Sequence, residues 1–286
     1  MAKYVLLLSL LVAPLLMHAQ KDAMLHTSKS DYPIRYGAMP KEDIKGFVDK
    51  VFNYISSVTP VEMINKQSGE PVDNPADADE NTVLKHGDFS ITSYEWGVTY
   101  SAFLSANKIF EDKKYADYVK DHFSFIAKWA PVIKKLKDKG VYSGENYPFR
   151  QPIDPHALDD AGAMCAAMIK ATTSGINSDL MPQINTYINW VAKKQYRLPD
   201  GTLARNRPQK NTLWLDDMYM AIPALSQMGK MTGDKKYFDD AIRQVKSFSK
   251  RMFNKEKNIY MHGWVESMET HPEFHWARAM AGRCLL

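Results

Sequence analysis

Residues 211–239 read NTLWLDDMYMAIPALSQMGKMTGDKKYFD and predict a helix, a tight turn and the start of a second helix. Apolar side chains at helical spacing mark the first helix, residues 214–231, and predict that it faces the core. These side chains are Leu213, Met220, Ala221 and Ala224. The second helix, residues 235–253, follows after a short connector. The stretch therefore predicts a helical hairpin.

The connector of this hairpin occurs a second time. Residues 112–117 read DKKYAD, and residues 234–239 read DKKYFD. In both places the motif begins the second helix of a predicted pair, which indicates a repeated helical-hairpin unit. The predicted helices span residues 41–58, 96–110, 113–129, 158–171, 180–194, 214–231 and 235–253. Pro131 is expected to end the third of them, because proline removes a helical hydrogen bond.

Irregular segments separate the predicted pairs. Residues 20–39 are polar and predict an N-terminal arm, and residues 60–90 are rich in polar residues and proline and predict a long surface excursion. Residues 140–155 and 197–208 carry proline and glycine and predict loops. Stacked hairpins form either an open solenoid or a closed toroid. Small and aromatic residues at the start of the first helix of each pair favour the toroid, with these helices inside.

The first residues have the layout of a secretory signal. Lys3 precedes the apolar run 5–17, and polar residues resume at His18. This pattern predicts a signal peptide over residues 1–19 and export to the periplasm, whereas a buried N-terminal helix is the alternative. The run is too short to span a membrane comfortably, so no membrane association is expected after cleavage. Residues 20–286 are then expected to form one domain.

Charge and cysteine content argue against several classes of protein. The formal net charge is +4, and the lysines are scattered along helices instead of forming a basic stripe, so nucleic acid is not an expected partner. Cys165 and Cys284 are the two cysteines, which are too few for a disulfide framework. The eight histidines show no metal-ligand spacing such as HExxH. Neither a metal nor another cofactor is therefore expected.

Asp216 and Asp217 are adjacent acids at the start of a predicted helix. Neighbouring residues are rotated by about 100° around a helix axis, so one carboxyl can face water while the other points inward. An inward carboxyl beside Trp214 is expected to have a raised pKa, which suits a proton donor. The alternative is that both acids only stabilise the positive end of the helix dipole.

Acidic, aromatic and basic side chains recur at the starts of the predicted inner helices and in the loops beside them. They are Glu95, Trp96, Gly97, Thr99 and Tyr100; Leu158, Asp159, Asp160 and Gly162; Trp214, Asp216 and Asp217; and His262, Gly263, Trp264, His271, Phe274, Trp276 and Arg278. Carboxylates beside aromatic rings are typical of a sugar site, where rings stack on the sugar and acids transfer protons. Taken singly, these acids also fit helix caps, the aromatics fit core positions, and the first histidine fits a structural hydrogen bond.

Several stretches resemble glycoside hydrolase family 105 and the related family 88, the unsaturated rhamnogalacturonyl and unsaturated glucuronyl hydrolases. They are EWGVTYSAF, ALDDAGAM, RLPDGTLARNRP, TLWLDDMYMAIPALSQMGKMTGDKKYFDDA, YMHGW and FHWARA, between residues 95 and 279. The most specific part is the run that ends at Asp216 together with residues 262–264. The resemblance implies an all-α fold, an (α/α)6 toroid of helical hairpins, with no metal and with a catalytic acid at Asp216.

The implied chemistry acts on a 4,5-unsaturated uronic acid, which a polysaccharide lyase leaves at the end of an oligosaccharide. The oligosaccharide is expected to come from pectin, above all rhamnogalacturonan, with a glycosaminoglycan as the alternative. The double bond in the ring of the uronic acid is an enol ether. Asp216 would protonate C4, and water directed by the same carboxylate would add to the cation at C5. The hemiketal then opens and releases the next sugar. One carboxyl serves as acid and then as base, because the first step leaves it ionised.

The same resemblance implies the other site residues. The second acid maps onto Asp159 or Asp160, and the spacing to Gly162 favours Asp160. The residues expected to bind the substrate are Trp96, Trp214, Trp264, Trp276, His262 and Arg278. Of these, the histidine and the arginine would bind the uronate carboxylate or hydroxyls, and Trp214 and Trp276 would stack on the sugar ring.

The sequence departs from the family pattern at its end. Relatives continue after ARA with Asn, Gly, Trp and further helices, whereas this chain continues with MAGRCLL. The toroid is therefore expected to be truncated at its C-terminus. Two alternatives stay open: another (α/α)6 sugar-active enzyme, such as an epimerase or a lyase, and an inactive carbohydrate-binding remnant. The aglycone and the oligomeric state are not predicted.

Overall fold

The computed structural model describes residues 37–142, 144–177 and 179–277. The chain divides into two compact units, Met1–Ile44 and Lys45–Leu286. The described part of the first unit is residues 37–44, an exposed irregular stretch followed by the first turn of a helix. The expected signal peptide lies outside the described residues, as do Arg278 and Cys284.

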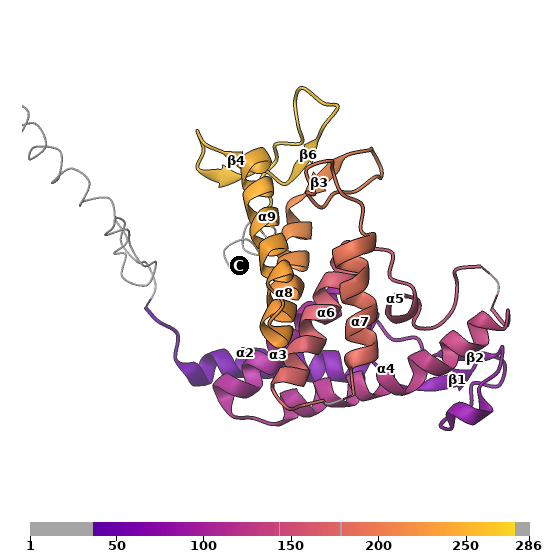
Figure 1. The fold of residues 1–286 in the computed structure, drawn as a ribbon. Coiled ribbons are helices and arrows are strands. Elements are labelled where there is room, and N and C mark those ends of the chain that lie inside the picture. Colours follow the sequence, from indigo (N-terminus) through magenta and orange to yellow (C-terminus); the bar gives the residue numbers. More distant parts are fainter. Residues whose placement is uncertain (1–36, 143, 178, 278–286) are drawn as a thin grey trace, which may run out of the picture. The chain divides into compact units, whose positions relative to one another are not determined.

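Helices make up most of the described structure (Figure 1). They are α2 (Lys41–Val58), α3 (Tyr94–Phe110), α4 (Lys114–Asp138), α5 (Arg150–Ile153), α6 (Leu158–Thr173), α7 (Met181–Asn189), α8 (Leu215–Thr232) and α9 (Lys235–Met252), with a 3-10 turn at Pro75–Asp77 and a π-helical turn at Trp190–Lys194. The strands are β1 (Met63–Asn65), β2 (Thr82–Leu84), β3 (Thr212–Trp214), β4 (Phe253–Asn254), β5 (Ile259–Tyr260) and β6 (Gly263–Val265). They form antiparallel pairs, β1 with β2, β3 with β6 and β4 with β5. None of the described helices is both long and apolar enough to cross a membrane.

The long helices of the second unit pair in chain order as α3 with α4, α6 with α7 and α8 with α9 (Figure 1). This arrangement confirms the predicted helical hairpins. The repeated connector has the same geometry in both places. The carboxylate of Asp112 accepts a hydrogen bond from the backbone N–H of Lys114 at 3.3 Å, and that of Asp234 accepts one from Lys236 at 3.1 Å. An aspartate turn therefore starts the second helix of the hairpin each time.

The first helices of the three hairpins pack side by side, with α6 between α3 and α8. Glycine makes both contacts close. A Cβ atom at Gly97 of α3 would lie 2.5 Å from the carbonyl carbon of Ala163 in α6. A Cβ atom at Gly162 of α6 would lie 2.4 Å from the carbonyl oxygen of Met220 in α8. No real side chain fits at such distances, so the backbones of the inner helices touch because these positions are glycine.

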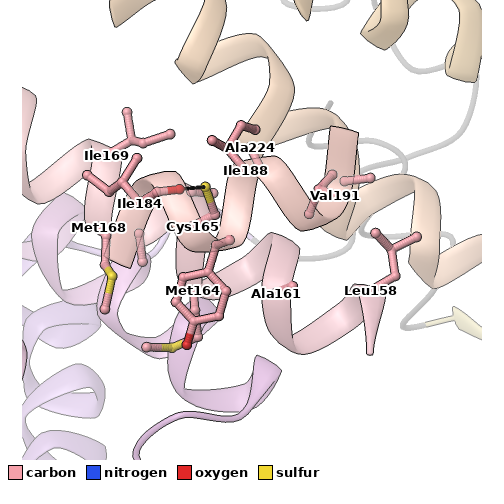
Figure 2. Packing of buried hydrophobic residues seen from close by; sticks show 14 of the residues in the cluster. Leu158, Ala161, Met164, Cys165, Met168, Ile169, Ile184, Ile188, Val191 and Ala224 are labelled. Atoms are coloured by element: carbon pink, nitrogen blue, oxygen red, sulfur yellow. Dashed lines mark hydrogen bonds between the residues drawn. The ribbon is translucent and has the colours of Figure 1, made fainter. Parts of the chain in front are cut away.

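Helix α6 is buried along most of its length. Figure 2 shows Leu158, Ala161, Met164, Cys165, Met168 and Ile169 of α6 packed near Ile184, Ile188, Val191 and Ala224. The thiol of Cys165 lies 3.9 Å from the carbonyl oxygen of Ile184, and burial raises its pKa well above the usual value. Cys165 is therefore an inert core residue, as its apolar surroundings in the sequence indicate.

Pro131 does not end the helix that contains it, and this part of the sequence prediction is wrong. Helix α4 continues through the proline to Asp138. Trp129, Ala130 and Ile133, on both sides of the proline, are buried in the core. Fully burying a large apolar side chain contributes about 1.5–3 kcal/mol, so together these residues offset the cost of about 3 kcal/mol for a proline inside a helix.

Two further predictions need correction. Trp214 belongs to β3 instead of the helix, and α8 begins one residue later. The cause is pairing with β6, a partner about 50 residues away that local periodicity does not reveal. The segment 60–90 is not only a surface excursion, because it contains β1 and β2, and Met63 and Thr82 are buried.

Candidate active site

The predicted acids come together at the starts of α3, α6 and α8. Glu95 lies in the first turn of α3, Asp159 and Asp160 in that of α6, and Asp216 and Asp217 in that of α8. Their charges act on one another: the Asp159 carboxylate disfavours ionisation of both Asp160 and Asp217, and Glu95 acts on Asp160 in the same sense. Three hairpins thus contribute carboxylates to one cluster.

Asp217 is the acid that α8 turns fully inward, and its side chain is 1% exposed. Arg205, in the loop before β3, donates to both carboxylate oxygens, from Nε to Oδ2 at 2.7 Å and from Nη2 to Oδ1 at 2.6 Å. Burial raises the pKa of Asp217, and the guanidinium opposes this rise. The inward carboxyl of the pair is therefore held in a bidentate ion pair.

Arg205 also reaches beyond this ion pair. Its Nη2 donates to Oδ2 of Asp159 at 3.1 Å, and its guanidinium carbon lies 4.5 Å from the centre of the Trp214 ring. Burial lowers the pKa of Arg205, but Asp217 and Asp159 outweigh burial, so the pKa ends above its usual value. One permanently charged side chain therefore connects the start of α6, the start of α8 and Trp214, the last residue of β3.

Asp160 is a further acid of the cluster whose pKa is raised. Its Oδ1 accepts the backbone N–H of Tyr94 at 2.8 Å, and its Oδ2 accepts Nε2 of Gln151 at 2.5 Å. Desolvation and the neighbouring Asp159 raise its pKa to about 6, against the effect of these two hydrogen bonds. Asp160 is thus fixed in orientation and titrates near neutral pH.

Asp216 lies beside His262. The distance from Oδ2 of Asp216 to Nδ1 of His262 is 3.4 Å, and the two side chains are 14% and 6% exposed. The β3–β6 pair sets this geometry, because Trp214 pairs with Gly263 and the N–H of Leu215 donates to the carbonyl of His262 at 2.9 Å. The acid follows one strand and the histidine precedes the other, so both stand at the same end of the pair.

Aromatic rings surround His262. The ring centre of Trp214 is 5.8 Å from that of the histidine, the centre of Phe274 is 4.8 Å away and that of Trp276 is 5.0 Å away. The backbone N–H of His262 donates to the backbone carbonyl of Phe274 at 3.0 Å. This hydrogen bond connects the last described segment to the residue before β6. Trp276 is 41% exposed and can offer a ring face to a ligand.

The other expected substrate contacts are not part of this group. Trp96 is 3% exposed, stacks on Phe89 with a centroid distance of 4.8 Å and donates from its indole N–H to the hydroxyl of Tyr118. This places its ring in the core of the α3–α4 hairpin. Trp264 lies with Arg251, whose guanidinium carbon is 5.3 Å from its ring centre. Arg278 lies outside the described residues.

Three residues that hold the acids were not singled out from the sequence. Arg205 lies in the loop RLPDGTLARNRP, where its composition indicates only a loop, and Gln151 and Tyr94 act on Asp160 from two other elements. A signal for Arg205 existed, because an acid predicted to point inward needs a cationic partner. Which arginine supplies the positive charge depends on the tertiary contact between the loop before β3 and the helix after it. The spacing of residues in the sequence does not reveal this contact.

The arrangement separates the acids by role. Asp217 is bound by Arg205, Asp160 holds a proton below about pH 6, and Asp216 lies beside His262, which is in turn surrounded by aromatic rings. Carboxyls in different environments beside aromatic rings suit proton transfer to a sugar. Within the described ranges, no group of three or more His, Cys, Asp and Glu side chains could hold a metal ion.

Comparison with known proteins places the chain among glycoside hydrolases. The family model described as Glycosyl Hydrolase Family 88 matches residues 54–282. A possible member of the GH105 family from Salmonella enterica serovar Paratyphi A superposes with a TM-score of 0.55 at 15% identity over 88% of this chain and 62% of its own. A possible member of the same family from Klebsiella pneumoniae gives 0.58 at 12% identity over 90% and 62%. A family 105 glycoside hydrolase from C. acetobutylicum gives 0.53 at 18% identity over 69% and 53%.

These likenesses concern the fold. The chain spans about three fifths of the length of the first two structures, and its mostly helical architecture is consistent with part of an α/α toroid. A comparison with curated protein sequences gave no match.

Proposed function

The chain belongs to glycosyl hydrolase family 88, and on this basis we propose that it removes a 4,5-unsaturated uronic acid from the end of an oligosaccharide. The substrate class proposed is the lyase-generated fragments of pectin, rhamnogalacturonan above all. Export to the periplasm belongs to the same proposal, because lyase products of extracellular polysaccharides arise outside the cytoplasm. It rests on the signal-like layout of the first residues of the sequence.

The observation that carries the proposal is the position of Asp216. Its carboxylate lies 3.4 Å from Nδ1 of His262 and is 14% exposed, whereas both oxygens of the neighbouring Asp217 are bound by Arg205. Of the two adjacent acids, Asp216 is therefore the one that can exchange a proton with a ligand.

The proposed reaction is a hydration followed by ring opening. Asp216 donates its proton to C4 of the unsaturated ring, and the electron pair of the C4=C5 bond forms the new C–H bond. This leaves an oxocarbenium ion at C5 and an ionised Asp216. The carboxylate then takes a proton from water as the water oxygen bonds to C5. The bond from C5 to the ring oxygen then breaks, which gives a ketone at C5 and a hemiacetal at C1. The hemiacetal collapses to an aldehyde as the C1–O glycosidic bond breaks, and the neighbouring sugar leaves with the hemiacetal proton on its oxygen.

The surrounding residues have binding roles in this proposal. Trp276 and Trp214 stack on the ring, and His262 orients the Asp216 carboxylate or binds a sugar hydroxyl. Asp160, with a pKa of about 6, assists as the second acid and is favoured over Asp159, which is bound by Arg205. Arg278 is proposed as the partner of the uronate carboxylate by the family resemblance.

The test is loss of the ultraviolet absorbance of the unsaturated uronate when the purified protein meets an unsaturated rhamnogalacturonan disaccharide. Asp216→Asn is the matched control, since it keeps the shape of the side chain. Decay of the band with the wild type alone supports the proposal. No decay with a folded wild type, for rhamnose-linked and amino-sugar-linked substrates alike, rejects it. Binding without decay would instead favour a carbohydrate-binding protein.

A further inference from the structure

A cleft of about 860 Å³ lies between α7, with its π-helical turn, and the first half of α9. Four of its lining residues are cationic: Lys193, Arg197, Lys236 and Arg243. Asp240 is the one acid among the lining residues, and no residue of the candidate active site is among them. The lining of this cleft therefore carries an excess of positive charge on a chain that is nearly neutral as a whole.

Part of this charge is neutralised in the floor of the cleft. The guanidinium of Arg197 donates to both carboxylate oxygens of Asp240, at 2.8 and 2.7 Å, and to the carbonyl of Gly201 at 2.9 Å. Burial would raise the pKa of Asp240, but Arg197, Gln244 and the nearby Arg243 outweigh it and lower the pKa below its usual value. Asp240 is thus ionised and fully engaged by its neighbours.

Of the three remaining cations, one is paired with a carboxylate and two are not. Lys236 pairs with Asp234 at 2.5 Å, outside the cleft lining. Lys193 and Arg243 are exposed, and neither forms a salt bridge within the described part of the chain. At least two positive charges therefore face the opening without a carboxylate paired to them, which favours an anionic ligand.

The rest of the lining is polar with one aromatic ring. Asn185, Thr186 and Asn189 lie along α7, and Tyr237 of α9 has a half-buried ring, with Nζ of Lys236 4.9 Å from the ring centre. Amide and hydroxyl groups bind sugar hydroxyls, and a tyrosine ring can stack on a pyranose. The volume lies in the range of about 300–1,000 Å³ that is usual for small-ligand sites.

We propose that this cleft is an accessory binding site for an acidic oligosaccharide, a short polyuronate chain. Lys193 and Arg243 bind its carboxylates, the asparagines bind its hydroxyls, and Tyr237 stacks on one ring. The choice of a uronate over another anion rests on the proposed function, in which the substrate is cut from a uronate polymer. Such a site would keep the protein on the polymer while a chain end reaches Asp216.

The test is calorimetric titration with saturated trigalacturonate, which has no ring double bond and is therefore not a substrate. The cleft variant is the double substitution Lys193→Glu and Arg243→Glu. Its control is Lys194→Glu and Lys246→Glu, which changes the net charge equally at exposed residues that do not line the cleft. We expect the cleft variant to bind at least tenfold more weakly than the wild type, and the control to stay within about threefold. Circular dichroism checks that both remain folded.

Three results would overturn the proposal: no binding by the wild type, equal loss in both double variants, or undiminished binding by the cleft variant. A neutral oligosaccharide of equal length that binds as tightly would reject the acidic ligand class. Trigalacturonate could also enter the candidate active site, so the titration is repeated on Trp276→Ala, which removes a ring proposed to stack on the sugar there. If the wild type binds trigalacturonate at the cleft but does not turn over the unsaturated disaccharide, the result counts against the proposed function alone.

Discussion

The side chains of Arg205 and Asp217 meet through two parallel hydrogen bonds, 2.7 Å from Nε to Oδ2 and 2.6 Å from Nη2 to Oδ1, at a depth where the carboxylate is 1% exposed. The arginine comes from the loop before β3 and the aspartate from the first turn of α8. Because Arg205 also binds Asp159 of α6, one ion pair connects two hairpins at the base of the acid cluster. We therefore expect mutations of Arg205 or Asp217 to change the stability of the protein, and mutation of Asp216 to change its proposed activity.

Replacing Arg205 with methionine should destabilise the fold. It leaves the buried carboxylate of Asp217 without its partner, and breaking a buried ion pair from one side costs about 3–5 kcal/mol of unfolding free energy. Arg207→Met is the control, because this exposed arginine on the same loop should change stability by no more than about 0.5 kcal/mol. Urea unfolding measures both. Equal midpoints for the two variants would show that the ion pair is not needed.

Amide substitution of the adjacent acids should affect different properties. Asp216→Asn should lower kcat on the unsaturated disaccharide by at least about 100-fold, since a positioned general acid contributes about 10²–10⁴-fold, with little change in melting temperature. Asp217→Asn should lower the melting temperature, because it weakens the bond to Arg205. Steady-state kinetics and thermal unfolding of the two variants decide this. An active Asp216→Asn protein would remove Asp216 from the proposed reaction.

Adding one methyl group where α6 meets α8 should be costly. The Cβ atom of Gly162→Ala would lie 2.4 Å from the carbonyl oxygen of Met220, so the helices must separate, at a cost of at least about 2 kcal/mol. Gly46→Ala in α2 is the control, since nothing lies within 4 Å of its Cβ position. That exchange should stabilise the helix by up to about 1 kcal/mol. Chemical denaturation should show shifts of opposite sign, and a tolerated Gly162→Ala would contradict the close packing.

Stability should depend on pH through Asp160. Its pKa is about 6 in the folded protein, against about 3.9 in an unfolded chain, so between these values the folded state keeps a proton that the unfolded state has lost. This contribution is full below about pH 4, declines as pH rises through 6 and is absent above it. It amounts to about 1–2 kcal/mol once solvent screening is allowed for.

Urea unfolding between pH 4 and pH 7 compares the wild type with Asp160→Asn. The variant should lack the decline in unfolding free energy that the wild type shows over this interval. Asp121→Asn, at an exposed acid of α4, serves as the control and should follow the wild type. Parallel curves for wild type and Asp160→Asn would mean that this carboxyl ionises alike in both states.

The sequence predicted the hairpins because their causes are local. Apolar spacing marks α6, α8 and α9, and an aspartate turn starts α4 and α9, so helix type and order follow from neighbours in the chain. The error at Pro131 has the opposite origin. Continuation of α4 depends on burial of Trp129 and Ile133 against other elements, which a local rule for proline does not include.

The candidate site could be predicted only as far as residue types. The sequence indicated Asp160 and Asp216 by their position at helix starts, His262 by its place in a neighbouring loop, and all three by family resemblance. It did not reveal that Asp217 turns inward onto Arg205, nor that Trp96 is a core residue, because both outcomes depend on contacts between hairpins. Rotation around the helix axis alone leaves open which of two adjacent acids faces the interior.

The pairing of β3 with β6 has a kinetic consequence. Strand β3 directly precedes α8 and β6 follows α9, so their pairing joins the two ends of the chain segment that contains both helices. Asp216 follows the end of β3 by two residues, and His262 directly precedes β6. A fluctuation that separates β3 from β6 also separates Asp216 from His262. We therefore expect the two side chains to leave and return to their 3.4 Å arrangement together with the strands. Amide hydrogen exchange at Leu215, whose N–H is bound to the carbonyl of His262, would measure the rate of this opening.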